Sequence, residues 1–115
     1  MASFVVAAAL MVPCAVQTAL AEEGMAVHYS DRFQGKPTAS GDKFDQEGLT
    51  AAHKKLPFGT KVKVTNLENR KSVEVTVNDR MRRDNRNVID VTRRAARELE
   101  FEKQGRAKVS VDVVK

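Results

Sequence analysis

Apolar and polar residues alternate with a period of two in three stretches of the chain. These stretches are Lys61–Thr65, Ser72–Val77 and Ala107–Val114, and valine supplies most of their apolar positions. A period of two puts successive side chains on opposite faces of a strand, so each stretch is predicted to be a half-buried β-strand. Because residues 66–71 between the first two stretches are polar and typical of turns, those two strands are predicted to form a hairpin.

Shorter apolar runs predict three further strands and one helix. The strands are expected at Met25–Tyr29, Gly48–Ala52 and Val88–Val91. Thr92 is a good N-cap for a helix over Arg93–Glu100. Six short strands with one short helix predict a mainly all-β fold, in which a small barrel closes its own sheet edges.

The first 21 residues differ from the rest because they carry no charged side chain. The apolar run Phe4–Val12 and the small residues Ala19 and Ala21 have the pattern of a secretory signal. We therefore expect a signal peptide over residues 1–21 and one domain over residues 22–115. A stable membrane span is not expected, because it needs about 20 apolar residues. Lipid anchoring at Cys14 is not expected either, because Pro13 stands where a lipidation signal has a small residue.

Composition limits the classes of partner and cofactor. The chain has 115 residues and a formal net charge of +5, which suits one small domain that binds acidic polymers. Without Trp and with a single Tyr, a base-stacking surface is poorly supplied, so nucleic acid is not expected as a partner. One cysteine excludes an internal disulfide, and His28 and His53 are too few for a histidine-rich metal site. We expect no metal and no organic cofactor.

His53 stands between the apolar run Gly48–Ala52 and a turn that contains Pro57 and Gly59. Pro57 fixes its own φ, and Gly59 can adopt a turn conformation that other residues avoid. A histidine between a strand end and such a turn is held rigidly, as a functional group must be. The alternative is a surface or packing histidine, and this stretch alone favours that alternative.

Two aspartates stand where predicted strands meet loops. Asp79 ends the run of alternating residues, where a barrel strand delivers side chains to its mouth. Asp90 lies inside an apolar run, so its carboxylate must find hydrogen bonds or a charged partner, or else its pKa shifts. Arg80 is an obvious partner for a carboxylate. The alternative to a functional role is a buried network that holds loops together.

These residue types suit the cleavage of a glycosidic bond. That reaction needs a group that protonates the leaving oxygen and a way to trap the oxocarbenium-like centre. One carboxyl group can serve as acid and then as base when the substrate supplies its own nucleophile. In peptidoglycan the C6 hydroxyl of muramic acid can do so, which gives a 1,6-anhydro product without water. Asp79 is the candidate for the acid and base, and His53 would share the proton or orient the sugar.

Four motifs carry a likeness to a known family, at Thr38–Asp45, Leu49–Thr60, Val77–Arg80 and Val88–Thr92. With them, residues 22–115 resemble the rare lipoprotein A (RlpA-like) family of bacterial envelopes. The resemblance implies a six-stranded double-psi β-barrel. It also implies an endolytic lytic transglycosylase of peptidoglycan that prefers glycan strands lacking stem peptides.

The resemblance also implies roles for particular residues. The catalytic pair falls on His53 and Asp79, and two further acidic substrate positions fall on Asp42 and Asp45. Arg80 and Asp90 are further substrate-binding candidates. Their place in the chain suggests them, and the family does not. The partner is then the peptidoglycan glycan strand, the location the periplasm or cell envelope, and the expected state a monomer.

Two departures from the family pattern leave an alternative open. Asp42 stands where the family usually has Glu, and Met81-Arg82 stands where it has Gly-Pro after the Asn-Asp-Arg motif. Loss of that Gly-Pro pair would move Asp79, and a displacement of about 1 Å can cost roughly a hundredfold in rate. The alternative function is a non-catalytic module that binds or loosens the wall, as the related expansins do. A secreted nucleic-acid binder is a third hypothesis, opposed by the signal and by the scarcity of aromatic residues.

Overall fold

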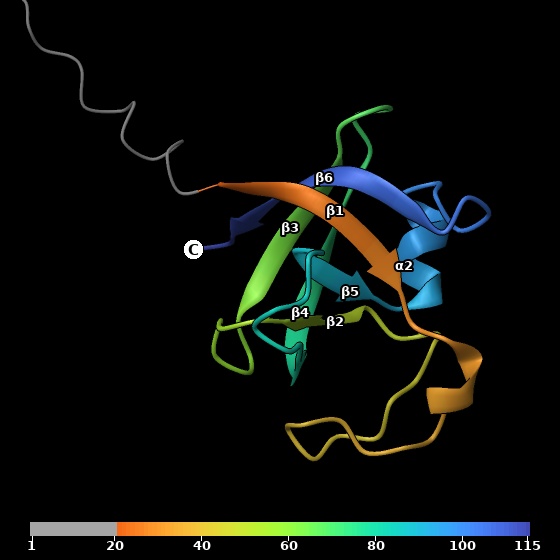
Figure 1. Ribbon diagram of the computed structural model, residues 1–115, viewed down its shortest axis with the longest axis vertical. Coiled ribbons are helices and arrows are strands. Elements are labelled where there is room, and N and C mark those ends of the chain that lie inside the picture. The colour runs from red at the N-terminus through yellow and green to blue at the C-terminus, as the bar shows by residue number, and fades with distance from the viewer. Residues whose placement is uncertain (1–20) are drawn as a thin grey trace, which may run out of the picture.

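Six strands close into a barrel in the computed structural model, which describes residues 21–115 (Figure 1). Around the barrel the strands follow the order β1-β5-β2-β4-β3-β6. Their bounds are Glu22–His28 (β1), Thr50–His53 (β2), Lys61–Asn66 (β3), Ser72–Arg80 (β4), Ile89–Val91 (β5) and Arg106–Val113 (β6). The structure thus confirms the mainly β barrel with one short helix.

Strand β2 lies between β4 and β5 in the barrel wall. It pairs with β4 in parallel and with β5 antiparallel. The second parallel pair is β1 with β5, and the predicted hairpin of β3 and β4 is antiparallel. Because β2 and β4 run in the same direction, the loops that follow them leave the barrel at the same edge.

The barrel interior is filled by the alternate residues that the sequence pattern singled out. Val62 and Val64 of β3, for example, are completely buried, while Lys61 and Lys63, which alternate with them, are exposed. Phe101, Leu99 and Ile89 are the largest side chains of the core, which also holds a row of valines and alanines. Sequence periodicity and burial agree because each strand shows only one face to the interior.

The helix α2, Arg93–Glu98, covers part of the barrel and begins at the predicted cap. Thr92 accepts a hydrogen bond from Ala95 N at 3.2 Å and donates one to Gly48 O at 2.7 Å. The helix ends two residues before the predicted Glu100. Glu100 has a φ of 63°, and a left-handed residue of this kind ends a helix.

Two strands are longer than expected. β1 begins at Glu22 rather than Met25, because Glu22 and Glu23 pair with Val111 and Ser110 of β6. β4 continues through Arg80 because it pairs with β2 as well as β3. Pairing partners far along the chain extend both strands through residues whose own pattern does not alternate. A short 3-10 helix at Asp31–Phe33 was also not predicted.

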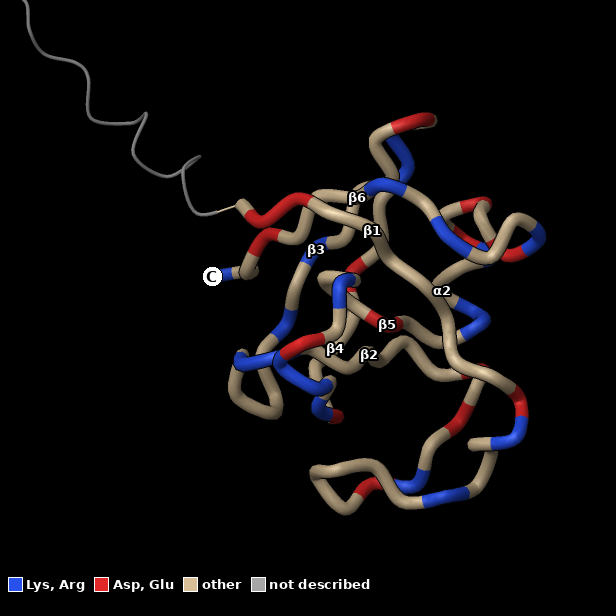
Figure 2. Tube along the Cα trace, viewed as in Figure 1, with Lys and Arg blue, Asp and Glu red and all other residues tan. Residues whose placement is uncertain are grey.

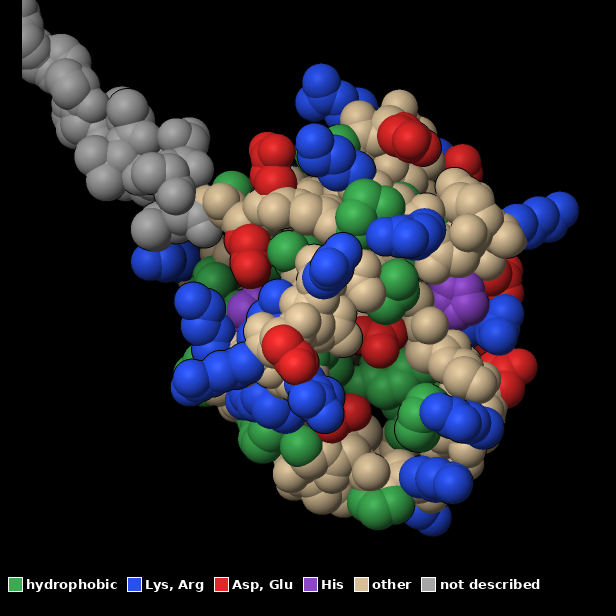
Figure 3. Space-filling view, in the orientation of Figure 1, with side chains coloured by type: hydrophobic (Ala, Val, Ile, Leu, Met, Phe, Trp, Pro, Cys, Tyr) green, Lys and Arg blue, Asp and Glu red, His purple; other side chains and the backbone are tan. Residues whose placement is uncertain are grey.

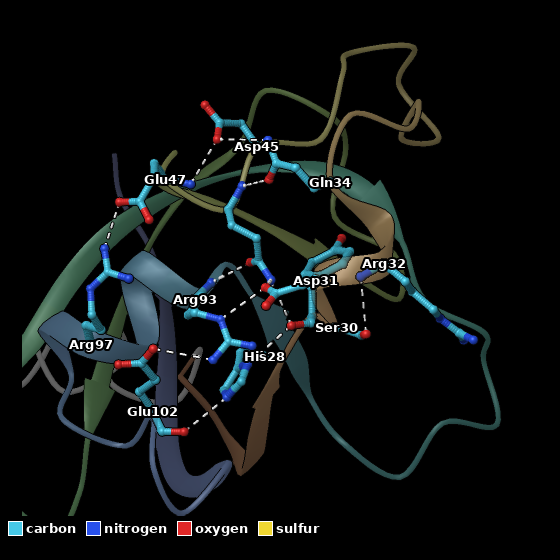
Figure 4. Close-up of polar contacts among 12 residues, drawn as sticks. His28, Ser30, Asp31, Arg32, Gln34, Asp45, Glu47, Arg93, Arg97 and Glu102 are labelled. Atoms are coloured by element: carbon cyan, nitrogen blue, oxygen red, sulfur yellow. Dashed lines mark hydrogen bonds and ion pairs between the residues drawn. The ribbon is translucent and has the colours of Figure 1, made fainter.

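The long segment between β1 and β2 is fastened to α2 by polar contacts (Figure 4). Arg93 donates to Asp31 at 3.1 Å and to Glu102 at 3.3 Å. Gln46 donates to Asp31 at 2.9 Å and accepts from Arg93 N at 2.8 Å. Arg97 adds a 2.7 Å contact to Glu47. These contacts fix both ends of a segment that contributes to the site described below.

The signal peptide and Cys14 fall on residues 1–20, outside the described part of the chain. From residue 21 onwards, no helix is long and apolar enough to cross a membrane.

Replacement of Thr92 tests the junction between the barrel and α2. Thr92→Ala removes the helix cap and leaves Gly48 O without its hydroxyl donor, so we expect a loss of about 2–3 kcal/mol in the free energy of unfolding. Thr92→Ser keeps the hydroxyl and should lose less than about 1 kcal/mol. Urea denaturation measures both values. Equal losses for the two variants would contradict the capping role.

Candidate active site

Asp79 and Asp90 lie in one row across three adjacent strands, with Ala52 between them. Ala52 of β2 is the register partner of Asp79 on β4 and of Asp90 on β5. Register partners share a face of the sheet, and neighbouring strands are about 4.8 Å apart, so the two aspartate Cα atoms are roughly 10 Å apart. We call Asp79, Ala52 and Asp90 the acidic row. Figure 3 shows acidic side chains near the middle of the displayed face, beside hydrophobic ones.

A β-bulge turns Asp79 onto this face. Val77 pairs with Ala51 and belongs to the core, whereas Asp79 pairs with Ala52, so the register shifts by the extra residue Asn78. Without that extra residue, Asp79 would follow the alternation of Val77 and point into the barrel. The bulge therefore aligns the carboxyl group of Asp79 with that of Asp90.

Three hydrogen bonds hold the carboxylate of Asp79. Tyr29 Oη donates to Oδ2 at 2.7 Å, Ala39 N donates to Oδ1 at 2.8 Å, and Arg80 N donates to Oδ1 at 2.9 Å. An ionised carboxylate only accepts hydrogen bonds, so three converging donors suit it. They also fix its orientation from three separate parts of the chain.

Tyr29 is a site residue that the sequence did not reveal. Its ring stacks on Phe44 at 4.2 Å between centroids, and both belong to a buried cluster with Ala52 and Met81. Burial, together with the hydrogen bond to Asp79, raises the pKa of Tyr29, so its hydroxyl stays a donor. The one available signal was that Tyr29 is the chain's single tyrosine and closes an apolar run.

Asp90 has no such set of donors. Its Oδ1 is buried without a hydrogen-bond partner among residues 21–115. Burial, and next the negative charge of Asp79, raise the pKa of Asp90 to about 7. Asp90 thus retains its proton in a large fraction of molecules near neutral pH, while the buried network considered as its alternative role is not formed.

Arg80 does not pair with a carboxylate in the described part of the chain. Its Nη1 donates to His53 O at 3.0 Å, and its guanidinium lies 4.5 Å from the ring centroid of Phe58. Phe58 is 43% exposed. The two side chains therefore form an exposed surface at the end of β4. As the register partner of His53, Arg80 leaves the face of β4 opposite to that of Asp79.

His53 is turned away from the acidic row. It follows Ala52 in β2, so its side chain leaves the opposite face of the strand, and it is only 2% exposed. Its Nδ1 accepts from Lys55 N and Leu56 N at 3.2 Å each, so the ring proton is on Nε2, which donates to Glu22 Oε1 at 2.9 Å. Within residues 21–115 no hydrogen bond joins His53 to Asp79. The catalytic roles predicted for His53 and Asp79 stay predictions.

The two predicted acidic substrate positions differ in their surroundings. Asp42 Oδ2 lies 3.5 Å from Asn78 Nδ2, next to Asp79. Asp45 accepts from Glu47 N at 3.0 Å, within the polar contacts of Figure 4. The structure therefore brings Asp42 to the acidic row and uses Asp45 to shape a turn.

Met81 secures the loop behind Asp79. It is 8% exposed, lies in the cluster of Tyr29 and Phe44, and its N donates to His53 O at 3.2 Å. The departure from the family's Gly-Pro pair thus adds a buried anchor, and Asp79 keeps its three donors. In residues 21–115 no group of three or more His, Cys, Asp or Glu side chains could hold a metal ion.

The protonation of Asp90 can be measured directly. We expect the carboxyl carbon of Asp90 to titrate in NMR with a midpoint near pH 7. Asp79→Asn should lower that midpoint, because it removes a neighbouring negative charge. An unchanged midpoint in this variant would show that the charge of Asp79 does not influence the pKa of Asp90.

Stability should depend on pH through the same group. The pKa of Asp90 is about 7 in the folded chain against a usual value of 3.8, so the folded state binds the proton more tightly. Asp90 therefore stabilises the fold below about pH 4, and this contribution is lost as the pH rises through 7. Relative to wild type, Asp90→Asn should gain stability between these pH values in thermal unfolding. Asp112→Asn, which changes a carboxyl group on β6, three strands away from β2, is the control.

Two solved structures share the fold of this chain. The chain is similar to the Streptomyces papain inhibitor, with a TM-score of 0.66 and 21% identity over 83% of this chain and 94% of that one. It is also similar to a Clavibacter michiganensis expansin mutant in complex with cellohexaose, with a TM-score of 0.64 and 20% identity over 83% of this chain and 50% of that one. Identities this low show the fold alone.

Closer relatives exist in sequence. The chain is 47% identical over 91 residues to the probable endolytic peptidoglycan transglycosylase RlpA of Synechocystis, covering 79% of this chain and 28% of the relative. It is 50% identical over 94 residues to the endolytic peptidoglycan transglycosylase RlpA of Rickettsia bellii, covering 79% and 41%. The chain thus spans less than half the length of these relatives. The family model described as lytic transglycolase matches residues 21–111. The chain therefore belongs to the lytic transglycolase family.

Proposed function

We propose that this barrel is an endolytic lytic transglycosylase that cuts peptidoglycan glycan strands, preferably those lacking stem peptides, and leaves 1,6-anhydromuramyl ends. The acidic row carries the proposal, because it holds a buried carboxyl with a pKa of about 7 beside a second, hydrogen-bonded carboxylate. Family membership and the names of the relatives support the same reaction.

The two carboxyl groups can divide the proton transfers. Asp90, in its protonated fraction, gives its proton to the leaving glycosidic oxygen as the bond to C1 breaks. The C6 hydroxyl of the same muramic acid then forms the new bond to C1, and Asp79 takes up the hydroxyl proton. Return of that proton from Asp79 to Asp90 restores the pair, so no water is consumed. Proton transfers of this kind supply about two to four decades in rate.

Other residues serve this chemistry indirectly. Tyr29 and Ala39 keep Asp79 oriented, and the exposed surface of Arg80 and Phe58 can contact a glycan strand beyond the row. His53 acts as a positioning residue, since its hydrogen bonds fix the turn after β2 and the start of β1.

The proposed location is the periplasm or cell envelope, reached through the signal predicted at residues 1–21. The relatives are named for action on peptidoglycan, which lies in the cell envelope, and this supports that location. We propose that the domain acts there as a monomer.

A non-catalytic wall-binding module is the second candidate. It is favoured by the fold shared with an expansin mutant whose solved complex contains cellohexaose. The same exposed surface of Arg80 and Phe58 would then hold a glycan that is not cut.

Product analysis decides between the two. Purified glycan strands without stem peptides are treated with wild type, Asp79→Asn and Asp90→Asn, and the products are identified by mass spectrometry. We expect 1,6-anhydromuramyl ends from wild type and a decrease of at least about a hundredfold for each variant. Asp112→Asn, which changes a carboxyl group on β6, three strands away from β2, should cut normally.

Other outcomes of that experiment are informative. Reducing ends would show hydrolysis by water instead of transglycosylation. Bound glycan without any product would favour the wall-binding module. Full activity of Asp90→Asn would contradict its role as the acid.

A further inference from the structure

Three basic side chains line a hollow of about 410 Å³ at the loops that follow β2 and β4. They are Lys54, Lys55 and Arg83, and no acidic residue in the described part of the chain lines the hollow. None of the three forms an ion pair within residues 21–115, whereas Arg82 on the same loop is held by Asp84 at 3.0 Å. Figure 3 shows Lys and Arg side chains gathered on the left of the displayed face. The hydrogen bond from Arg82 and, more weakly, the charge of nearby Lys54 lower the pKa of Asp84, but no ion pair between described residues neutralises the three cations of the hollow. Their shared charge points to an anionic ligand.

The hollow lies where the loops after β2 and β4 leave the barrel together. Lys54 follows β2 directly and Arg83 lies three residues beyond the end of β4. His53 O joins the two loops, because it accepts from Met81 N at 3.2 Å and from Arg80 Nη1 at 3.0 Å. Figure 2 shows basic segments close together in this region of the trace.

The distance from the acidic row suits a neighbouring sugar. Lys54 is two residues beyond Ala52, which corresponds to roughly 7 Å along a strand. With the scissile bond at the acidic row, we expect a neighbouring sugar of the glycan strand to reach this hollow.

We propose that this hollow binds the free lactyl carboxylate of a muramic acid near the cleaved bond. The proposal rests on the proposed function. The repeating disaccharide of the glycan has one ionisable group, the lactyl carboxyl, and attachment of a stem peptide converts that group into a neutral amide. The planar guanidinium of Arg83 and the ammonium groups of Lys54 and Lys55 are suited to a carboxylate.

Recognition of this kind makes the charge of the sugar a criterion of selection. A strand without stem peptides presents a carboxylate to the hollow at each muramic acid. An amidated strand presents none, and leaves three cations without a partner. The preference for strands lacking stem peptides then arises from a favourable contact and does not require that peptides be excluded by size.

Binding measurements separate charge from bulk. The probes are glycan strands of one length, without stem peptides, carrying either free lactyl carboxylates or their methylamides. The parent protein is Asp90→Asn, which we expect to cut at least about a hundredfold more slowly. It is compared with the same protein carrying Lys54→Gln and Arg83→Gln. Lys55 is left unchanged because it also lines a second hollow, which His53 and Glu22 line as well.

The control variant carries Arg106→Gln and Lys108→Gln in the parent. Both residues are exposed on β6, three strands away from β2 in either direction around the barrel. Their replacement removes two positive charges, as in the Lys54/Arg83 variant. We expect the parent and the control to bind the carboxylate strand about three- to tenfold more tightly than the methylamide strand at low salt. The Lys54/Arg83 variant should show less than about a twofold difference.

The proposal is overturned if the Lys54/Arg83 variant keeps the preference, if the control loses it equally, or if the parent shows none. Circular dichroism establishes that each variant is folded. Because binding is measured without cleavage, these outcomes are distinct from a failure of the proposed reaction, which is judged by the products of wild type.

Discussion

The placement of a buried carboxyl group beside a second carboxylate is the constraint on which the site depends. Asp90 is removed from water and lacks the donors that would stabilise its charge, whereas Asp79 has three. The difference between their surroundings gives two identical side chains different chemical states. Strand β2 makes this possible because it separates the two carboxyl groups with a residue no larger than alanine.

The segment between β1 and β2 completes these surroundings. It supplies Ala39, whose backbone reaches Asp79, and Phe44, on which Tyr29 stacks. Its fastening by Arg93 and Gln46 therefore connects the helix to the acidic row. These contacts hold the loop along its length, so that it forms one side of the site.

Sequence patterns predicted the barrel well because each strand buries one face. The alternating valines located β3, β4 and β6, and the apolar run around Asp90 correctly drew attention to a carboxyl group whose pKa had to shift. The bulge at Asn78 could not be predicted, since it is defined by the pairing of β4 with a strand distant in sequence. The contact of Tyr29 with Asp79 spans fifty residues, and no local pattern encodes it. For the same reason the sequence could not show that His53 turns towards Glu22.

The hydrogen bond from His53 to Glu22 has a consequence for maturation. Glu22 is the first residue of β1 and directly follows the position where the predicted signal would be cut. Removal of one residue more would delete the acceptor of a buried imidazole at the closing strand of the barrel. If the predicted signal at residues 1–21 is removed, the cut must leave Glu22 in place for His53 to keep this hydrogen bond.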